Sequence, residues 1–235
     1  MMRKIKKLLF KNKFVYDLLR HIVGIFYVIA GKKNFAIGGV KIVNKGNARI
    51  RKQVAGSGNV VIIGEDAYLF DVNIRIRGND NRIIIGENVS LGTGSSFWVE
   101  GNGVEIIIGD SCTFTHTVEF AAQEDGRKIL IGKDCMFSNN IKVRTSDSHP
   151  IIDRESGKRI NFAKDVYIGN HVWIAPNTTV MKGAYIEDGA IIGSDTMVNS
   201  FIGHNCLAVG HPAIVKKENV EWRRDSVLGN IPNLI

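Results

Sequence analysis

Two side chains in this sequence stand where they could do chemistry. His149 lies in the stretch RTSDSHPIID, residues 144–153, and Trp173 ends the hexapeptide IGNHVW. An imidazole with an unperturbed pKa of about 6.5 is mostly neutral at pH 7, so it can accept a proton from a hydroxyl group as that oxygen attacks an acyl carbon. An indole offers one N–H donor and a flat apolar ring. His149 therefore suits base-assisted attack by a hydroxyl group, whereas Trp173, directly after the inserted segment, either covers that loop or belongs to the site.

A six-residue repeat supplies the elements that must position these residues. Apolar residues recur at every sixth position, and three hexapeptides make an 18-residue triangular coil. The first residues of successive triplets are 42, 63, 85, 108, 131, 168 and 186, with spacings of 21, 22, 23, 23, 37 and 18. Most coils therefore carry a short extra loop, and one carries 19 additional residues that begin at His149. We expect an all-β solenoid whose stacked coils share one core.

Composition favours one domain in a reducing compartment. A chain of 235 residues that is 44% hydrophobic can bury a substantial core, and no Ser/Gly-rich linker divides it. Cys112, Cys135 and Cys206 each occupy the fifth position of a hexapeptide. We interpret them as small core residues at the corners of the coil rather than as ligands or nucleophiles. Three unpaired core thiols are typical of a reducing compartment.

The positive charge is confined to the N-terminal segment. Residues 1–35 hold nine Lys and Arg side chains against Asp17 alone, whereas the remaining 200 residues hold 22 basic and 22 acidic side chains. Residues 1–36 read as a basic amphipathic helix. Its uncharged run, 21–31, has 11 residues and is too short to span a bilayer. The helix either lies on a membrane surface or caps the first coil. We expect no nucleic-acid partner.

Three motifs carry a resemblance to a known family. The hexapeptide run 168–198, the SDSHPIID break and the ending AVGHPAIVKK make residues 40–215 similar to the hexapeptide-repeat acyltransferases. Within that family the chain looks closest to the O-acetyltransferases of bacterial capsules and O-antigens, including those acting on sialic acid polymers. The resemblance implies a left-handed parallel β-helix of about seven to eight coils over residues 37–215, with an inserted loop at 149–164 and a tail helix at 216–235. It also implies a homotrimer with active sites between subunits.

The resemblance implies an activity and roles for particular residues. Acetyl-CoA would donate an acetyl group directly to a saccharide hydroxyl, with His149 as base and Trp173 beside it, and no metal would take part. The residues expected to contact the acceptor are Asn139, Asn140, His116, Arg154 and Lys158. Small residues and lysines near the end of the solenoid are expected to bind CoA, namely Ala175, Gly193, Ser194, Gly210, Pro212, Ala213, Lys216 and Lys217.

Three other functions stay open on the sequence alone. The same scaffold could acetylate the amino group of a nucleotide-linked sugar. It could be a γ-type carbonic anhydrase, which needs three zinc histidines, although only His116 and His149 lie near the right region. It could also be a binding solenoid without catalysis. For the favoured function we expect a cytoplasmic protein at the inner face of the bacterial membrane.

Overall fold

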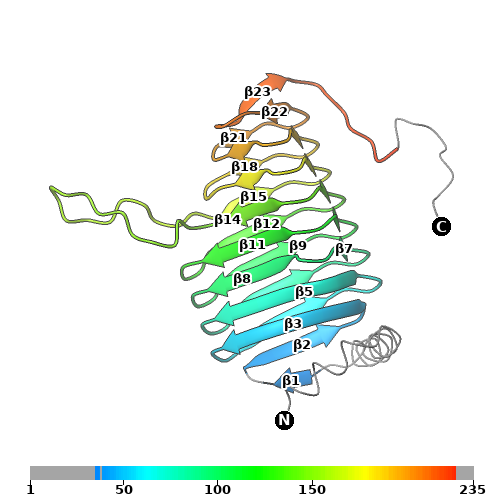
Figure 1. Ribbon diagram of the computed structural model, residues 1–235, viewed down its shortest axis with the longest axis vertical. Helices are drawn as coiled ribbons and strands as arrows, with labels where there is room; N and C mark the ends of the chain where they lie inside the picture. Colours follow the sequence, from blue (N-terminus) through cyan, green and yellow to red (C-terminus); the bar gives the residue numbers. More distant parts are fainter. Residues whose placement is uncertain (1–34, 38, 226–235) are drawn as a thin grey trace, which may run out of the picture.

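A computed structural model describes residues 35–37 and 39–225 as a solenoid of stacked parallel strands (Figure 1). The described residues form strands and turns but no helix. The predicted all-β solenoid is therefore confirmed, while its handedness and its number of coils stay predictions. Residues 1–34 of the expected N-terminal helix lie outside the described part.

One face of the solenoid is a nine-stranded sheet. Its strands are parallel except for the first, which pairs antiparallel with β2. Each strand stacks on the strand of the next coil, so its backbone groups are paired along the whole face. The strands, in spatial order, are β1 (Phe35–Ile37), β2 (Val40–Asn44), β4 (Asn59–Ile63), β6 (Arg82–Ile85), β9 (Glu105–Ile108), β12 (Lys128–Ile131), β15 (Val166–Ile168), β18 (Tyr185–Ile186) and β21 (Phe201–Ile202).

The two other faces belong to one continuous 14-stranded sheet, because β5 (Tyr68–Arg77) pairs with both β7 and β8 and β3 (Asn47–Ala55) pairs with β5. The second face holds β7 (Ser90–Leu91), β10 (Thr113–Phe114), β13 (Met136–Phe137), β16 (Trp173–Ile174), β19 (Ile191–Ile192), β22 (Leu207–Val209) and antiparallel β23 (Ile214–Lys217). The third face holds β8 (Ser96–Glu100), β11 (Val118–Gln123), β14 (Ile141–Arg144), β17 (Thr179–Val180) and β20 (Met197–Val198).

The register of the strands follows the six-residue repeat. Ile85, Ile108 and Ile131 are direct partners, and the column continues through Ile168 and Ile186. All five side chains are buried. Since inward residues stack on their own equivalents, the core is a set of apolar columns. Repeat positions 63 to 198 are thus confirmed.

The first coil departs from the expected register. Asn44, rather than Ile42, pairs with Ile63, so the coil begins two residues later than the spacing suggested. Asn44 is 7% exposed, and its Oδ1 accepts a hydrogen bond of 3.1 Å from the backbone N–H of Gly46. A buried polar group is tolerated when it is hydrogen-bonded. The apolar pattern could not reveal this position because its occupant is polar.

The three cysteines occupy the corners, as expected. All are free and buried. The Sγ of Cys135 lies 3.1 Å from the carbonyl oxygen of Gly169 in the next coil, and the Sγ of Cys112 lies 3.1 Å from that of Gly132. A hydrogen bond with Cys112 and burial raise the pKa of Cys135, so its thiol stays protonated. These are packing residues rather than nucleophiles.

The tail prediction was wrong for the described residues. Lys216 and Lys217 belong to strand β23, and residues 218–225 contain no helix. Trp222 holds this segment against the solenoid. Its ring stacks on His171 at 4.1 Å between centroids, and its Nε1 donates to the His171 carbonyl oxygen at 2.8 Å.

Candidate active site

The long insertion forms an arm that leaves the solenoid between β14 and β15. The arm, residues 147–164, projects outward from the stacked coils (Figure 1). Its two strands of chain run antiparallel, with a bridge between Ile152 and Arg159 and a hydrogen bond of 2.9 Å from the Ile160 N–H to the Ile151 carbonyl. Arg154 and Lys158 therefore lie at its tip, whereas His149 lies at its base.

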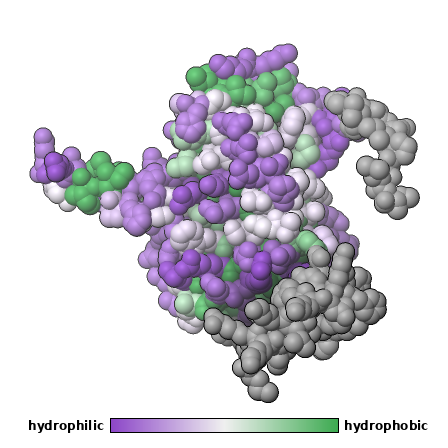
Figure 2. Space-filling model, viewed as in Figure 1, coloured by the Kyte–Doolittle hydropathy of each residue, from purple (hydrophilic) through white to green (hydrophobic). Residues whose placement is uncertain are grey.

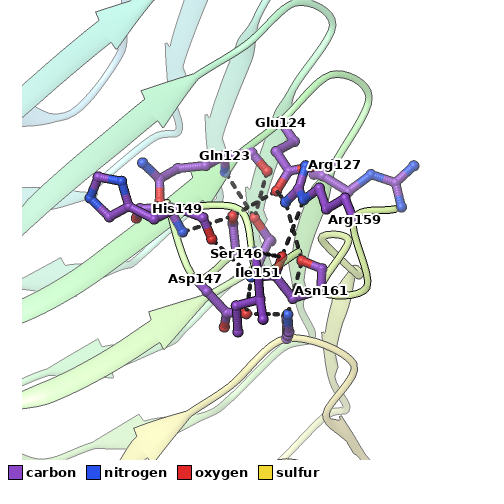
Figure 3. Close-up of polar contacts among 12 residues, drawn as sticks. Gln123, Glu124, Arg127, Ser146, Asp147, His149, Ile151, Arg159 and Asn161 are labelled. Atoms are coloured by element: carbon purple, nitrogen blue, oxygen red, sulfur yellow. Dashed lines mark hydrogen bonds and ion pairs between the residues drawn. The ribbon is translucent and has the colours of Figure 1, made fainter. Parts of the chain in front are cut away.

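His149 is exposed, and its backbone is held firmly. The preceding residue, Ser148, adopts a left-handed φ of 68°, which is uncommon for a residue with a side chain. The Ser148 hydroxyl accepts from Arg144 at 3.0 Å and donates to Gln123 at 2.7 Å, which fixes that turn. The imidazole points away from these contacts (Figure 3) and makes no hydrogen bond to any described residue. It is therefore free to meet a ligand.

Asn161 makes the central hydrogen bonds of the arm base, the part of the arm next to the coils that contains Asp147, His149 and Asn161. Its side-chain amide donates to the Asp147 carboxylate at 2.8 Å and to the His149 carbonyl oxygen at 2.9 Å. Its Oδ1 accepts from the Ile151 N–H at 2.6 Å. Asn161 is 8% exposed, so these bonds are shielded from water. The second strand of the arm thus fixes the position of the histidine on the first.

Two ion pairs fasten the arm base to the coils. Lys182 pairs with Asp147, and Arg159 reaches Glu124 with contacts of 2.8 and 2.5 Å (Figure 3). The hydrogen bond from Arg159 lowers the pKa of Glu124 despite partial burial. Burial would raise the pKa of Asp147, but hydrogen bonds from Lys182 and Asn161 lower it below its ordinary value. Both carboxylates therefore stay ionised at neutral pH and keep the arm attached.

Replacing Asn161 by alanine should lower kcat by about 10- to 100-fold, because a misplaced base loses much of its effect. The structure gives the reason, since Asn161 touches the backbone of His149 and not its ring. We expect unchanged acetyl-CoA binding and no rescue by Asn161→Asp, which keeps an acceptor for Ile151 but loses both N–H donors and sets a second carboxylate against Asp147. Steady-state kinetics on the three proteins measure this, and an Ala variant with wild-type kcat would contradict the positioning role.

Several predicted acceptor residues gather on one edge of the solenoid, which we call the turn ridge. It consists of the turns that join the second face to the third, at 115–117, 138–140, 175–178 and 193–196. His116 and Asn140 are neighbours there, with a 3.2 Å bond from the Asn140 N–H to the His116 carbonyl. The Asn140 amide also donates to Asn177 at 2.9 Å. The Asn139 carbonyl oxygen accepts from the Asn177 N–H at 3.1 Å.

The turn ridge also holds predicted CoA residues. Ala175 is buried at 6% exposure and bonds to Ile192, while Ser194 is exposed on the next coil. Gly193 has an internal reason to be glycine, because a Cβ there would lie 2.5 Å from Val209 Cγ1. Its small size therefore reflects packing within the chain. The expectation that a ligand requires Gly193 has no separate support from this geometry.

The remaining predicted CoA residues lie at the C-terminal end of the solenoid. Gly210 adopts a φ of 109°, and its carbonyl accepts a 3.0 Å bond from the Met197 N–H. Pro212 is exposed, and Ala213 packs against the core. Lys216 and Lys217 are exposed on β23. Because β23 runs antiparallel to β22, from Ile214 beside Val209 to Lys217 beside Leu207, the two lysines lie toward the end of β22 that is away from the turn ridge.

Trp173 lies on a different face from His149. It projects half-buried from the second face, in the same column as Met136 and Ile191, and its ring centroid is 6.2 Å from that of Trp222. His149 instead follows β14 of the third face. That four-residue strand, at about 3.3 Å per residue, also separates the arm base from the turn ridge by roughly 13 Å. The chain thus places its candidate residues in two separate groups, the arm base with His149 and the turn ridge with Trp173, which we call the two half-sites.

Some residues of the arm base were missed by sequence reasoning, namely Glu124, Asn161 and Lys182. None belongs to a motif, and only the fold brings them together.

The described residues contain no group of three or more His, Cys, Asp or Glu side chains that could hold a metal ion. No helix in the described ranges is long and apolar enough to cross a membrane.

Comparison with known proteins shows the family to which the chain belongs. The family described as "Bacterial transferase hexapeptide (six repeats)" matches residues 165–200. The polysialic acid O-acetyltransferase of Neisseria meningitidis is 37% identical over 173 residues, which cover 73% of this chain and 78% of the relative. The chain belongs to this family of hexapeptide-repeat acetyltransferases.

Two further comparisons agree with this membership. The crystal structure of the polysialic acid O-acetyltransferase OatWY superposes with a TM-score of 0.69 at 30% identity, covering 83% of this chain and 95% of that one. The polysialic acid O-acetyltransferase of Escherichia coli O1:K1 is 38% identical over 85 residues, which are 36% of this chain and 28% of that relative. The chain thus spans under a third of that longer protein in the alignment.

Proposed function

We propose that the protein transfers an acetyl group from acetyl-CoA to a hydroxyl of an acidic bacterial surface saccharide. The observation that carries this is His149, an exposed imidazole on a rigidly held backbone in a chain 37% identical to a polysialic acid O-acetyltransferase. Loops fixed on a rigid scaffold are where catalytic groups are commonly placed. The relatives' names supply the acceptor class, polysialic acid.

The acetyl group passes directly from CoA to the acceptor, without a covalent intermediate on the enzyme. His149 takes the proton from the acceptor hydroxyl as its oxygen attacks the thioester carbonyl, and the CoA thiolate leaves with the proton that His149 returns. No nucleophile from the enzyme is required, which agrees with the buried cysteines. The oxyanion formed on the carbonyl needs a hydrogen-bond donor, and the indole N–H of Trp173 is our candidate.

The acceptor and CoA would bind around the turn ridge. Asn139, Asn140 and His116 present amide and imidazole groups suited to sugar hydroxyls. The pantetheine chain would follow the ridge past Ala175, Gly193 and Ser194 toward Gly210, Pro212 and Ala213, with Lys216 and Lys217 near the phosphates. The cations at the arm tip, Arg154 and Lys158, would attract an acidic chain to the site.

A homotrimer would unite the two half-sites. The arm points away from its own coils, and four of its apolar side chains are more than half exposed: Ile151, Ile152, Ile160 and Phe162 (Figure 2). Apolar patches of this kind mark interaction surfaces. The arm of one copy, carrying His149, would then reach the Trp173 and turn ridge of the next copy.

A second surface supports association of identical copies. One outward column of the nine-stranded sheet is apolar in every coil, and its last rings stack, with centroids 4.5 Å apart for Tyr167 and Tyr185 and 5.9 Å apart for Tyr185 and Phe201. We call this column the apolar stripe: Val43, Ile62, Ile84, Ile107, Leu130, Tyr167, Tyr185 and Phe201. Around a threefold axis the stripes of three copies can meet.

Replacing Tyr185 by aspartate should convert the trimer to monomers, because a charge would be buried unpaired in an apolar interface. Sedimentation velocity measures the outcome. Tyr68→Asp is a matched control, since Tyr68 is 47% exposed and Tyr185 is 45% exposed, and Tyr68 lies on the second face. A Tyr185→Asp protein that sediments like wild type would exclude the stripe as the interface.

Acetyl uptake tests the proposed reaction directly. Purified protein is given acetyl-CoA with polysialic acid or with a nucleotide-linked amino sugar, and the products are analysed by mass spectrometry before and after mild alkali. An alkali-labile acetyl group on the polymer is expected. Alkali-stable acetylation of the amino sugar would instead support the N-acetyltransferase alternative.

The cellular location also stays a proposal. Lipid-linked polysaccharide is assembled at the inner face of the membrane, so an enzyme that modifies it would benefit from binding there. The net charge of residues 1–35 supports this, because each lysine or arginine near an anionic lipid surface contributes about 1 kcal/mol.

A further inference from the structure

A groove on the third face lies apart from both half-sites. It has a volume of about 500 Å³ and crosses the outer side of β3, β5 and β8. Its polar and aromatic lining includes Arg51, Gln53, Asn73, Arg75, Ser96 and Trp98. We call it the β3–β8 groove. Hydrophilic side chains gather on this part of the molecule (Figure 2).

Strand register connects the groove to the arm. Gln53, Arg75, Trp98, Ala121 and Arg144 are successive partners in one column of the third face, in which Ala121 is covered by its neighbours and fully buried. Arg144 ends β14, five residues before His149. Neighbouring strands lie about 4.8 Å apart, so the four steps from β14 to β3 cover on the order of 20 Å. A linear ligand that entered at the arm base could follow this column across several of its repeating units.

The groove offers unused hydrogen-bonding groups. The side chains of Gln53, Asn73 and Ser96 make no hydrogen bond to any described residue, and the indole Nε1 of Trp98 is buried without an acceptor there. Buried polar groups are nearly always paired, so a lone donor calls for a partner. Alcohol and carboxylate oxygens, which a saccharide carries in number, are suitable acceptors.

The charge of the groove favours an acid. The Arg75 guanidinium lies 5.5 Å from the Trp98 ring centroid and has no ion-pair partner within the described ranges. Arg51 is paired with Asp71 at 3.0 Å, but its side chain is 62% exposed, which leaves donors open to solvent. Guanidinium groups bind carboxylates through two parallel hydrogen bonds. Glu119 lines only the edge toward β11, and one carboxylate leaves the arginines in excess.

We propose that the β3–β8 groove is a secondary site for a carboxylate-bearing saccharide chain, which holds the acceptor polymer several sugar units away from the residue being acetylated. This rests on the proposed function for the identity of the polymer. The site would make the enzyme prefer long chains to short ones, because only a long chain reaches both the arm base and the groove.

Kinetics with two chain lengths measure the effect. For Arg75→Glu, we expect KM for long-chain polysialic acid to rise about tenfold or more, while kcat, KM for acetyl-CoA and KM for a sialic acid dimer stay within twofold of wild type. Trp98→Phe keeps an aromatic ring and removes the indole N–H, and should raise the long-chain KM by a smaller factor. Lys45→Glu is the control, since Lys45 is an exposed cation outside the groove.

A binding measurement separates this inference from the proposed reaction. Calorimetric titration of polysialic acid into His149→Ala and into His149→Ala/Arg75→Glu requires no turnover. Weaker binding by the double variant supports the groove, even if wild-type protein acetylates nothing. The inference would be overturned if the two proteins bind the polymer equally or if neither binds it. It would also be overturned if His149→Ala/Lys45→Glu loses as much affinity as His149→Ala/Arg75→Glu.

Discussion

Alanine in place of His149 is expected to lower kcat by about 10²–10⁴, the usual contribution of a general base. The imidazole has no hydrogen-bond partner among the described residues, so its removal breaks no hydrogen bond there. The hydrogen bonds that hold the arm base involve the backbone of this residue and survive the substitution. Acetyl-CoA binding and the oligomeric state should therefore remain unchanged while turnover falls.

Release of free CoA thiol in the presence of the acceptor measures this loss. His204→Ala is a suitable control, because His204 is another exposed histidine and is tied through its backbone N–H to Glu187 at 2.9 Å. We expect the control to stay within twofold of wild type. If His149→Ala keeps more than a third of wild-type kcat, the base lies elsewhere.

Much of the fold could be predicted from the apolar period alone. Ile108 stacks on Ile85 and Ile131. Because the same inward position is apolar in successive coils, apolar residues recur at regular intervals in the sequence. Asn44 and Trp222 show where this reasoning ends. Asn44 fills an apolar column with a polar group, and Trp222 fixes the tail through a ring stack with His171, 51 positions away.

The candidate site, like the fold, could be predicted from the sequence only in part. His149 could be singled out because it begins the only long break in the repeat. Its supports could not, since Lys182 lies 35 positions from Asp147 and Glu124 lies 22 positions from Ser146. Such partners are chosen by the stacking of coils and carry no local pattern. The separation of His149 from Trp173 onto two faces likewise became evident only from the strand pairing.

Because His149 and Trp173 lie on different faces of the solenoid, we expect two inactive variants to regain activity when they assemble in one oligomer. His149→Ala and Trp173→Ala are each expected to be nearly inactive alone. If every active site takes its histidine from one copy and its tryptophan from the next, some sites in a mixed trimer contain both wild-type residues. A mixed trimer of either composition has one such site, so about a third of the sites in the isolated mixed trimers are intact. Activity should then exceed that of either variant by more than tenfold.

The two variants are co-expressed with different affinity tags, and trimers carrying both tags are isolated before kcat is measured. Trimers purified separately and then mixed, without exchange of subunits, are the control and should stay inactive. Restored activity requires the two residues to act across a subunit boundary, because neither chain holds both. Inactive mixed trimers would place the pair within one chain, against the outward direction of the arm. A fully active Trp173→Ala protein would show instead that the oxyanion is stabilised by another donor, and the N–H groups of the turn ridge would be the next to test.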